Sequence, residues 1–145
     1  MRERDRSDTA PLRVAVIIGS TREGRAGEKV GRWFMERAAA RDDLELAVVD
    51  LVDFDFPARY PDRATEQMRE FSTEVGRADA FVVAVEQLRS VFTELHTVTL
   101  RNGVSINLLD EALDDRDRAA GLMLDQLGWW GLALREARAA RPYVS

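Results

Sequence analysis

Residues 12–27 read LRVAVIIGSTREGRAG, an apolar run followed by a glycine-rich loop. The run from Leu12 to Ile18 is typical of a central parallel strand that helices cover on both faces. From Gly27 onward apolar residues recur at helical spacing, which predicts a helix that ends near residues 42–43. A second strand is predicted over residues 44–51. Strand, loop, helix and strand form a βαβ unit, so we expect an α/β fold with a parallel sheet.

Beyond the second strand, helical and strand patterns continue to alternate. Pro57 and Pro61 mark a loop between two of these patterns. The further predicted elements are a helix over residues 64–77, a strand over 78–83, a helical stripe over 85–95, a last strand over 97–100 with a candidate extension at 104–106, and a closing helix over 119–141.

The junction between Val83 and Ala84 lacks the residues that normally separate a strand from a helix. No Gly, Pro, Asn or Asp lies between the predicted strand and the helical stripe that begins at Val85. Such a connection usually needs at least two or three loop residues. One long helix through residues 64–96 would remove the anomaly, because apolar residues are three or four positions apart throughout, and it stays open as an alternative.

The length of 145 residues is that of one ordinary domain, and 46% of the residues are hydrophobic. We expect a disordered N-terminal extension over residues 1–10 and one globular domain over residues 11–145. A formal net charge of -5 argues against binding to nucleic acid or to an anionic membrane. No apolar run is long enough to span a membrane and no signal peptide is recognisable, so we expect a cytoplasmic protein.

Residue types that several kinds of chemistry require are absent. The sequence has no Cys, and its single His is His96, which argues against disulfides, a thiol nucleophile and a zinc site. No pattern indicates a general acid or base, so we assign neither a catalytic residue nor a metal ligand. Trp129 and Trp130 are interpreted as core or dimer-packing residues of the closing helix.

The loop after the first strand carries the chemistry that we expect. Backbone N–H groups at a helix N-terminus lack intrahelical partners and attract a phosphate. Glycines allow close backbone approach, hydroxyls donate hydrogen bonds and arginines add charge-assisted ones. The loop has neither a Walker pattern nor Gly-x-Gly-x-x-Gly, and a glycine-rich turn with surface arginines is the structural alternative. The candidate phosphate-binding residues are Gly19, Ser20, Thr21, Arg22, Gly24, Arg25, Ala26 and Gly27.

The chain resembles the NADPH-dependent FMN reductase family of flavodoxin-like proteins over nearly everything after Pro11. The resemblance is carried by VAVIIGSTREGRAG at residues 14–27, VVDL at 48–51, DFP at 55–57, ADAFVV at 78–83, AVEQLR at 84–89 and RAARPY at 138–143. It implies a flavodoxin-like three-layer sandwich that binds FMN and passes hydride from NADH or NADPH to the flavin, and from there to acceptors such as quinones. It assigns the FMN phosphate to Ser20, Thr21 and Arg22 with the backbone of residues 24–27.

The family pattern is interrupted between Val83 and Ala84. Relatives have at this point a Thr-Pro-Glu-Tyr-Asn-like loop, a helix, a fourth strand and a Ser-Tyr-Gly-Gly-like turn, none of which this sequence contains. We therefore expect an internal deletion, a sheet of about four strands in the order 2-1-3-5, and activity impaired by the loss of loops that hold the isoalloxazine ring. The exposed strand edge favours a homodimer or homotetramer. A non-catalytic relative that binds FMN, another phosphate ligand or a partner chain is the alternative.

Overall fold

The computed structural model describes residues 10–59, 61–84, 97–100, 102–106, 113 and 116–142. Its elements are strand β1 (Leu12–Ile18), helix α1 (Gly27–Ala38), strand β2 (Leu44–Asp50), the 3-10 turn η2 (Leu51–Asp53), helix α2 (Glu66–Gly76), strand β3 (Ala80–Val83) and helix α4 (Asp117–Ala140). This order confirms the alternation of strands and helices that the sequence predicts over residues 12–83.

The three strands form one parallel sheet in the order β2-β1-β3. β1 pairs with β2 along its whole length, with Leu12 level with Leu44 and Ile18 level with Asp50. On its other edge β1 pairs with β3, and Ile17 is level with Val83. The carboxyl ends of the strands therefore lie at one edge of the sheet, where the loop after β1 begins.

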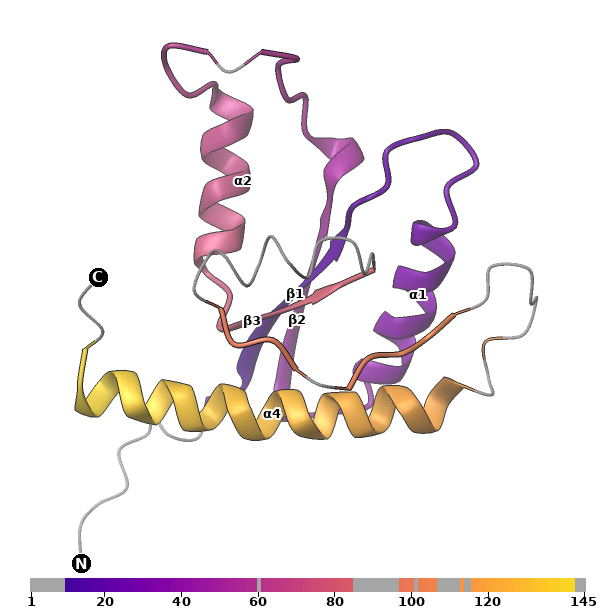
Figure 1. Ribbon diagram of the computed structural model, residues 1–145, viewed down its shortest axis with the longest axis vertical. Coiled ribbons are helices and arrows are strands. Elements are labelled where there is room, and N and C mark those ends of the chain that lie inside the picture. The colour runs from indigo at the N-terminus through magenta and orange to yellow at the C-terminus, as the bar shows by residue number, and fades with distance from the viewer. Residues whose placement is uncertain are drawn as a thin grey trace, which may run out of the picture.

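Helices cover both faces of the sheet, which gives three layers (Figure 1). On one face, Val16 of β1 belongs to the same apolar cluster as Phe34 of α1 and Leu124 of α4. On the other face, Ile17 of β1 clusters with Phe71 of α2. Alternating residues of β1 thus serve two cores, and the arrangement confirms the α/β class and is consistent with a flavodoxin-like fold.

Two glycines allow the helices of the first layer to approach β1 closely. A Cβ on Gly31 of α1 would lie 2.8 Å from Cδ1 of Ile18, and a Cβ on Gly131 of α4 would lie 2.8 Å from Cδ1 of Leu12. Because protein interiors are close-packed, a side chain at either position would displace the strand residue or the helix. These glycines therefore set how near the two helices lie to the central strand.

Asp79, just before β3, ties three elements together. Its Oδ2 accepts hydrogen bonds from the backbone N–H of Arg13 at 3.0 Å and from the guanidinium of Arg135 on α4 at 2.7 Å. Arg135 also donates to the carbonyl oxygens of Ala10 and Pro11, at 2.7 and 3.1 Å. The carboxyl-terminal half of α4 is thereby held against the start of β1.

The expectation of a fourth strand at residues 97–100, with its candidate extension at 104–106, is wrong. Neither segment is a strand, and the sheet within the described ranges has three strands. Leu100 and Val104 instead pack against the core shared by α1 and α4, and the backbone N–H of Asn102 donates to the side chain of Gln126 at 3.2 Å. β-branched residues favour a strand only where they fit a pleated surface, and here contacts with a helix replace that surface.

The alternative of one long helix through residues 64–96 is also wrong. α2 ends at Gly76, and residues 80–83 pair with β1. Hydrogen bonding continues past the strand, because the backbone N–H of Ala84 donates to the carbonyl oxygen of Ile17 at 3.1 Å. Pairing with a buried central strand outweighs the helical spacing of the apolar residues in this segment. The helical stripe predicted over residues 85–95 lies outside the described residues.

Val16 and Val48 are paired partners on neighbouring strands, but Val16 is 1% exposed and Val48 is 50% exposed. We expect Val16→Ala to lower the free energy of unfolding by about 2–3 kcal/mol, because it removes buried methyl groups and leaves a cavity. Val48→Ala is the matched control and should cost less than about 1 kcal/mol. Urea unfolding followed by circular dichroism measures both, and equal losses would contradict this description of the core.

Candidate functional site

The loop of residues 19–26 lies where the two crossover connections of the sheet diverge. The connection from β1 to β2 passes through α1 on one face, and the connection from β2 to β3 passes through α2 on the opposite face. In open parallel sheets such a change of face leaves a crevice at the carboxyl ends of the strands, where ligands bind. The topology thus places the loop at the edge where a ligand site is expected.

Gly24 shapes the loop through its backbone conformation. Its φ angle is 68°, in the left-handed region that residues with a side chain rarely adopt. A Cβ at this position would meet no atom within 4 Å, so the constraint comes from the backbone and not from a lack of space. The turn at Gly24 returns the chain toward β1, so that α1 begins beside Ser20.

Ser20 has a buried hydroxyl with no hydrogen-bond partner in the described part of the chain. A Cβ on Gly27 would lie 2.5 Å from the Ser20 Oγ and 3.1 Å from Cγ2 of Ile18, so only glycine leaves room for this hydroxyl. Most buried polar atoms in native proteins are satisfied by protein, water or a ligand. The Ser20 hydroxyl therefore lies at the start of α1 with unused hydrogen-bonding capacity.

The first turn of α1 receives no cap from its N-cap residue. That residue is Ala26, whose side chain cannot accept a hydrogen bond. The first bond within the helix runs from the N–H of Val30 to the carbonyl oxygen of Ala26, at 3.1 Å. The amide groups before Val30 form the positive end of the helix dipole, an arrangement that binds anions such as phosphate.

Arg25 is engaged by an acidic residue on the neighbouring strand. Its guanidinium pairs with both carboxylate oxygens of Asp50, with Nη2 at 2.6 Å from Oδ2, and Nη1 also donates to the carbonyl oxygen of Ser20 at 2.9 Å. Both side chains of the pair are largely buried. The hydrogen bonds from Arg25 hold the pKa of Asp50 below its usual value. Arg25 therefore fastens the loop to the end of β2.

Arg22 differs from Arg25 in exposure and in partners. It is exposed, it lines the cavity beside the loop, and it forms no ion pair with another described residue. Arg22 is therefore the loop arginine whose charge no described residue neutralises.

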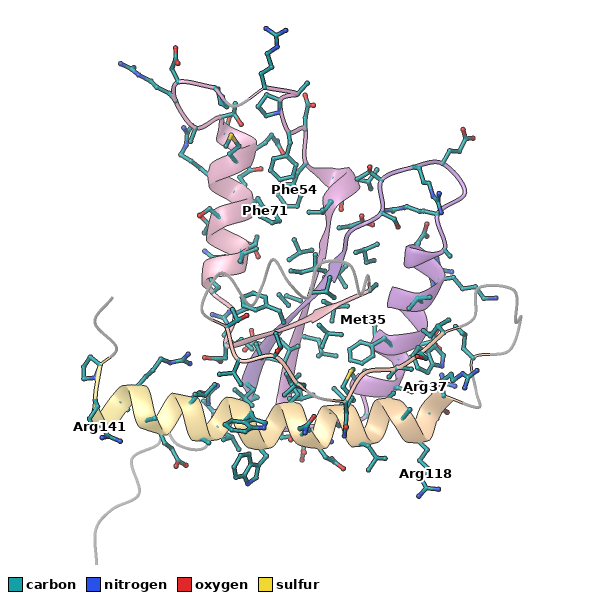
Figure 2. All side chains as sticks on the ribbon, in the orientation of Figure 1. Met35, Arg37, Phe54, Phe71, Arg118 and Arg141 are labelled. Atoms are coloured by element: carbon teal, nitrogen blue, oxygen red, sulfur yellow. The ribbon has the colours of Figure 1, made fainter. Side chains whose placement is uncertain are left out.

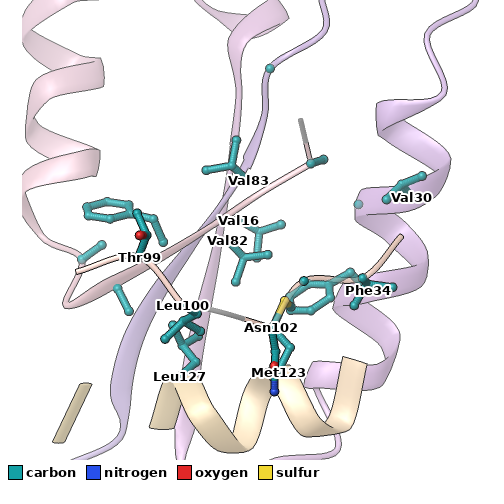
Figure 3. A pocket seen from close by; sticks show the side chains of 18 of the residues that line it. Val16, Val30, Phe34, Val82, Val83, Thr99, Leu100, Asn102, Met123 and Leu127 are labelled. Atoms are coloured by element: carbon teal, nitrogen blue, oxygen red, sulfur yellow. The ribbon is translucent and has the colours of Figure 1, made fainter. Parts of the chain in front are cut away.

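The cavity beside the loop has a volume of about 1610 Å³. It extends from the loop between α1 and β3 toward α4, and Figure 3 shows its apolar walls, which include Val30 and Phe34 of α1, Val83 of β3 and Leu127 of α4. Pockets that hold drug-sized ligands measure about 300–1,000 Å³. The cavity has room for a ligand of cofactor size.

The structure brings five of the eight candidate loop residues to this cavity. They are Gly19, Ser20, Arg22, Ala26 and Gly27. The other three lie apart from the lining: Thr21 is exposed, Gly24 forms the turn and Arg25 faces Asp50. The group that gathers at the cavity consists of a hydroxyl, a guanidinium and the backbone at the start of α1.

Two parts of the site were missed from the sequence. Asp50 is the last residue of β2 and lies one position before the end of the strand predicted over residues 44–51. Parallel pairing places it level with Ile18, so a carboxylate at the end of a neighbouring strand was an available signal for the partner of Arg25. Residues 97–100 and 102–106 also line the cavity, and no sequence signal indicated this because their pattern is that of a strand.

A search of the described residues for a metal site finds no cluster of three or more His, Cys, Asp or Glu side chains suited to hold an ion. In the same ranges no helix combines the length and apolar character that crossing a membrane requires.

Comparison with known proteins identifies one relationship. The family model described as NADPH-dependent FMN reductase matches residues 12–85, just over half of the chain. The match covers β1, α1, β2, α2 and β3, and it therefore includes the whole candidate loop. No curated protein and no solved structure matches the chain significantly.

The pair of Arg25 and Asp50 predicts a pH-dependent contribution to stability. Because the pKa of Asp50 is lower in the folded chain than in the unfolded one, the pair stabilises the fold above about pH 4 and loses this effect as the pH falls through the folded-state value. We expect Asp50→Asn to lower the thermal midpoint at pH 7, and the difference from wild type to shrink below about pH 4.

The matched control is Asp55→Asn, which alters an exposed carboxylate in the segment that follows β2 and η2 and should leave the midpoint nearly unchanged. Thermal unfolding from pH 3 to pH 8 measures both variants. A difference for Asp50→Asn that stays constant down to pH 3 would show that the ion pair does not produce it.

Proposed function

The chain belongs to the NADPH-dependent FMN reductase family of flavin-dependent oxidoreductases, and on that premise we propose that it binds FMN through loop 19–27 and reduces FMN or a quinone-like acceptor with electrons from NADPH. Bound FMN supplies the redox chemistry, because the flavin ring takes hydride from a nicotinamide and passes electrons to an acceptor. The residues of the chain bind this group, orient it and exclude water from it.

The observation that carries the proposal is the buried, unpartnered hydroxyl of Ser20 beside Gly27. A buried polar group without a partner destabilises a folded protein by about 1–3 kcal/mol, so its retention favours a role in binding. A phosphate oxygen placed at the start of α1 would accept a hydrogen bond from this hydroxyl. The same position is electrostatically favourable because of the helix dipole.

Arg22 and Thr21 complete the proposed phosphate site. The guanidinium of Arg22 lines the cavity and supplies the positive charge, since charge-assisted hydrogen bonds to phosphate are about twice as strong as neutral ones. Thr21 is exposed next to it and offers a second hydroxyl. The backbone of residues 26 and 27 adds the amide end of α1.

Arg25 is proposed to act as a positioning residue. Its guanidinium donates to the carbonyl oxygen of Ser20 and is neutralised by Asp50. This contact holds the backbone of Ser20 in place, and so it fixes the point from which the Ser20 side chain extends. A role of Arg25 in direct binding of phosphate is correspondingly less favourable than that of Arg22.

The flavin ring is proposed to lie in the cavity that leads from the loop along β3. Apolar walls from Val30 and Val83 are suited to a flat aromatic ring system. The described part of the sheet ends at β3, and residues 97–100 and 102–106 line this region without forming a strand. We propose that FMN binds weakly and that electron transfer is slow, because the family loops that enclose the ring are missing from the sequence after Val83.

A second candidate function is binding without catalysis, and the interruption after Val83 favours it. In that case the loop still binds FMN or another phosphate-bearing ligand. Consumption of NADPH measured by absorbance, with saturating FMN and a quinone acceptor, distinguishes the two. A rate equal to that of the same mixture without protein would leave binding as the function.

Removal of the Arg22 side chain tests the phosphate site. We expect Arg22→Ala to weaken FMN binding about tenfold, which corresponds to about 1.4 kcal/mol, and to leave riboflavin binding unchanged, because riboflavin lacks the phosphate. Arg32→Ala is the matched control, since Arg32 is an exposed arginine on α1 that pairs with Glu28 and does not line the cavity.

Titration of flavin fluorescence measures these affinities. Equal losses for FMN and riboflavin would mean that the loop does not recognise the phosphate. A wild-type dissociation constant near or above ~1 mM, only about -4 kcal/mol of binding free energy, would contradict FMN as the physiological cofactor.

Ser20→Ala separates binding from stability. The substitution removes an unsatisfied buried hydroxyl, so the free energy of unfolding of the ligand-free chain should stay equal or rise by up to about 1 kcal/mol. FMN binding should weaken in the same variant, because a donor to the phosphate is lost. Urea unfolding and the flavin titration measure the two effects. A clear loss of stability together with unchanged FMN affinity would assign Ser20 a structural role only.

A further inference from the structure

The cavity beside the loop is larger than one ligand requires, and it has a second end. Its volume of about 1610 Å³ exceeds the range of about 300–1,000 Å³ for a pocket that holds one drug-sized ligand. One end lies at Ser20, and the other reaches Asp79 and Arg138 near the start of β3. Asp79 contacts Arg13, five residues before Ile18 on β1, so the two ends are about 16 Å apart along the strand. We call the second end the α4 end of the cavity.

Helix α4 bounds this end because it crosses the amino ends of the strands. Figure 2 shows the helix extending from Arg118 at one end to Arg141 at the other. Its Gly131 lies against Leu12, the first residue of β1. The side of α4 that faces the sheet therefore also faces the cavity.

This side of α4 presents a regular row of residues to the cavity. Successive members are four or three positions apart, so at about 100° per residue they share a sector about 80° wide. Four members are apolar and the last is a cation, and the row is about 22 Å long at 1.5 Å per residue. The members of this row, which we call the cavity row, are Met123, Leu127, Trp130, Leu134 and Arg138.

The wall of the cavity across from this row is apolar as well. Ala80 and Val82 of β3 and the nearby Leu100 line the cavity, and they pack against the core that contains Leu127. Figure 3 shows Met123 and Leu127 projecting from α4 toward the side where Val82 and Leu100 lie. A chain of CH₂ groups placed between these walls would lose its contact with water, which favours binding.

Arg138 gives the α4 end a positive charge that is only weakly compensated. The nearby carboxylate of Asp79 is already engaged, because its Oδ2 accepts a hydrogen bond from Arg135 at 2.7 Å. Nη2 of Arg138 is 4.0 Å from Oδ1 of Asp79, at the outer limit of an ion pair, and the Arg138 side chain is 52% exposed. The two arginines and the single carboxylate together carry one net positive charge. A ligand with one negative charge is therefore favoured at this end.

We propose that the α4 end of the cavity binds an apolar monocarboxylate, a medium-chain fatty acid in type, with its chain along the cavity row and its carboxylate on Arg138. A guanidinium binds a carboxylate with two parallel hydrogen bonds, which suits the single cation at this end. The apolar part of the row, from Met123 to Leu134, is about 16 Å long and suits an unbranched chain. This site lies at the opposite end of the cavity from the phosphate site proposed at loop 19–27, and it does not depend on FMN.

Calorimetric titration of the full chain with hexanoate, octanoate and decanoate, without flavin, tests the apolar part of the site. We expect one bound molecule per chain and an affinity that rises about fourfold for each added CH₂, because each buried CH₂ contributes a nearly constant transfer free energy. Absence of decanoate binding, or an affinity that does not depend on chain length, would overturn the proposal.

Substitution of Arg138 tests the charged part. We expect Arg138→Gln to weaken decanoate binding about tenfold and to leave decanol binding unchanged, because decanol lacks the carboxylate. Arg141→Gln is the matched control, since Arg141 is exposed three positions further on and does not line the cavity. An equal loss for decanol and decanoate in Arg138→Gln, or an equal loss of decanoate affinity in both variants, would contradict the contact with Arg138.

Two leucines on opposite sides of α4 test the place of the chain. Leu134→Glu puts an acidic group in the cavity row and should abolish decanoate binding. Leu132→Glu changes a residue that is 39% exposed and does not line the cavity, and it should bind decanoate as the wild type does. Circular dichroism verifies that both variants are folded. Unchanged decanoate binding by a folded Leu134→Glu would overturn the proposed position.

The Arg22→Ala variant distinguishes the two ends of the cavity. It should bind decanoate with wild-type affinity, because Arg22 lies at the loop. A loss of decanoate affinity in this variant would place the carboxylate at the loop and overturn the proposal. Since the decanoate titrations contain no flavin, their failure would leave the FMN site untouched, and failure of FMN binding would leave this site untouched.

Discussion

The rest of the structure depends on one constraint: β1 is buried on both of its faces and paired along both of its edges. An apolar strand in this position requires a strand on each side and helices above and below. β2 and β3 meet the first requirement, and α1, α4 and α2 meet the second. Since the two crossovers use opposite faces, the crevice at the carboxyl end of β1 follows from the same constraint. The candidate site is thus a consequence of how the central strand is covered.

Two arginines three positions apart in this loop differ in their partners and in their exposure. Arg25 reaches the end of β2, where Asp50 neutralises it, and it also contacts the carbonyl oxygen of Ser20. Arg22 lies exposed at the cavity. The first arginine makes the loop rigid at a fixed distance from the sheet, and the second adds positive potential without such a partner. A rigid loop with one uncompensated cation is well suited to bind an anion.

Membership of the NADPH-dependent FMN reductase family rests on the part of the chain that contains the loop, and the described sheet is smaller than the one expected. Residues 97–100 and 102–106 lie beside the cavity as irregular chain, with Leu100 and Val104 in the core that α4 shares and Asn102 bonded to Gln126 of α4. The inner side of α4 closes the core and lines the cavity, and its outer side exposes Leu122, Trp129 and Leu132.

The sequence alone determined the βα unit over residues 12–27, the parallel sheet, the place of the glycine-rich loop and the family. These features depend on local periodicity, on glycine at particular positions and on motif order, all of which are written along the chain. Three other features were decided only by the tertiary structure. They are the ion pair of Arg25 with Asp50, the unpartnered hydroxyl of Ser20, and the irregular conformation of residues 97–100, where a strand was expected. Each depends on which distant group lies beside a residue. Strand register and helix packing determine which group lies there, and local sequence preferences do not.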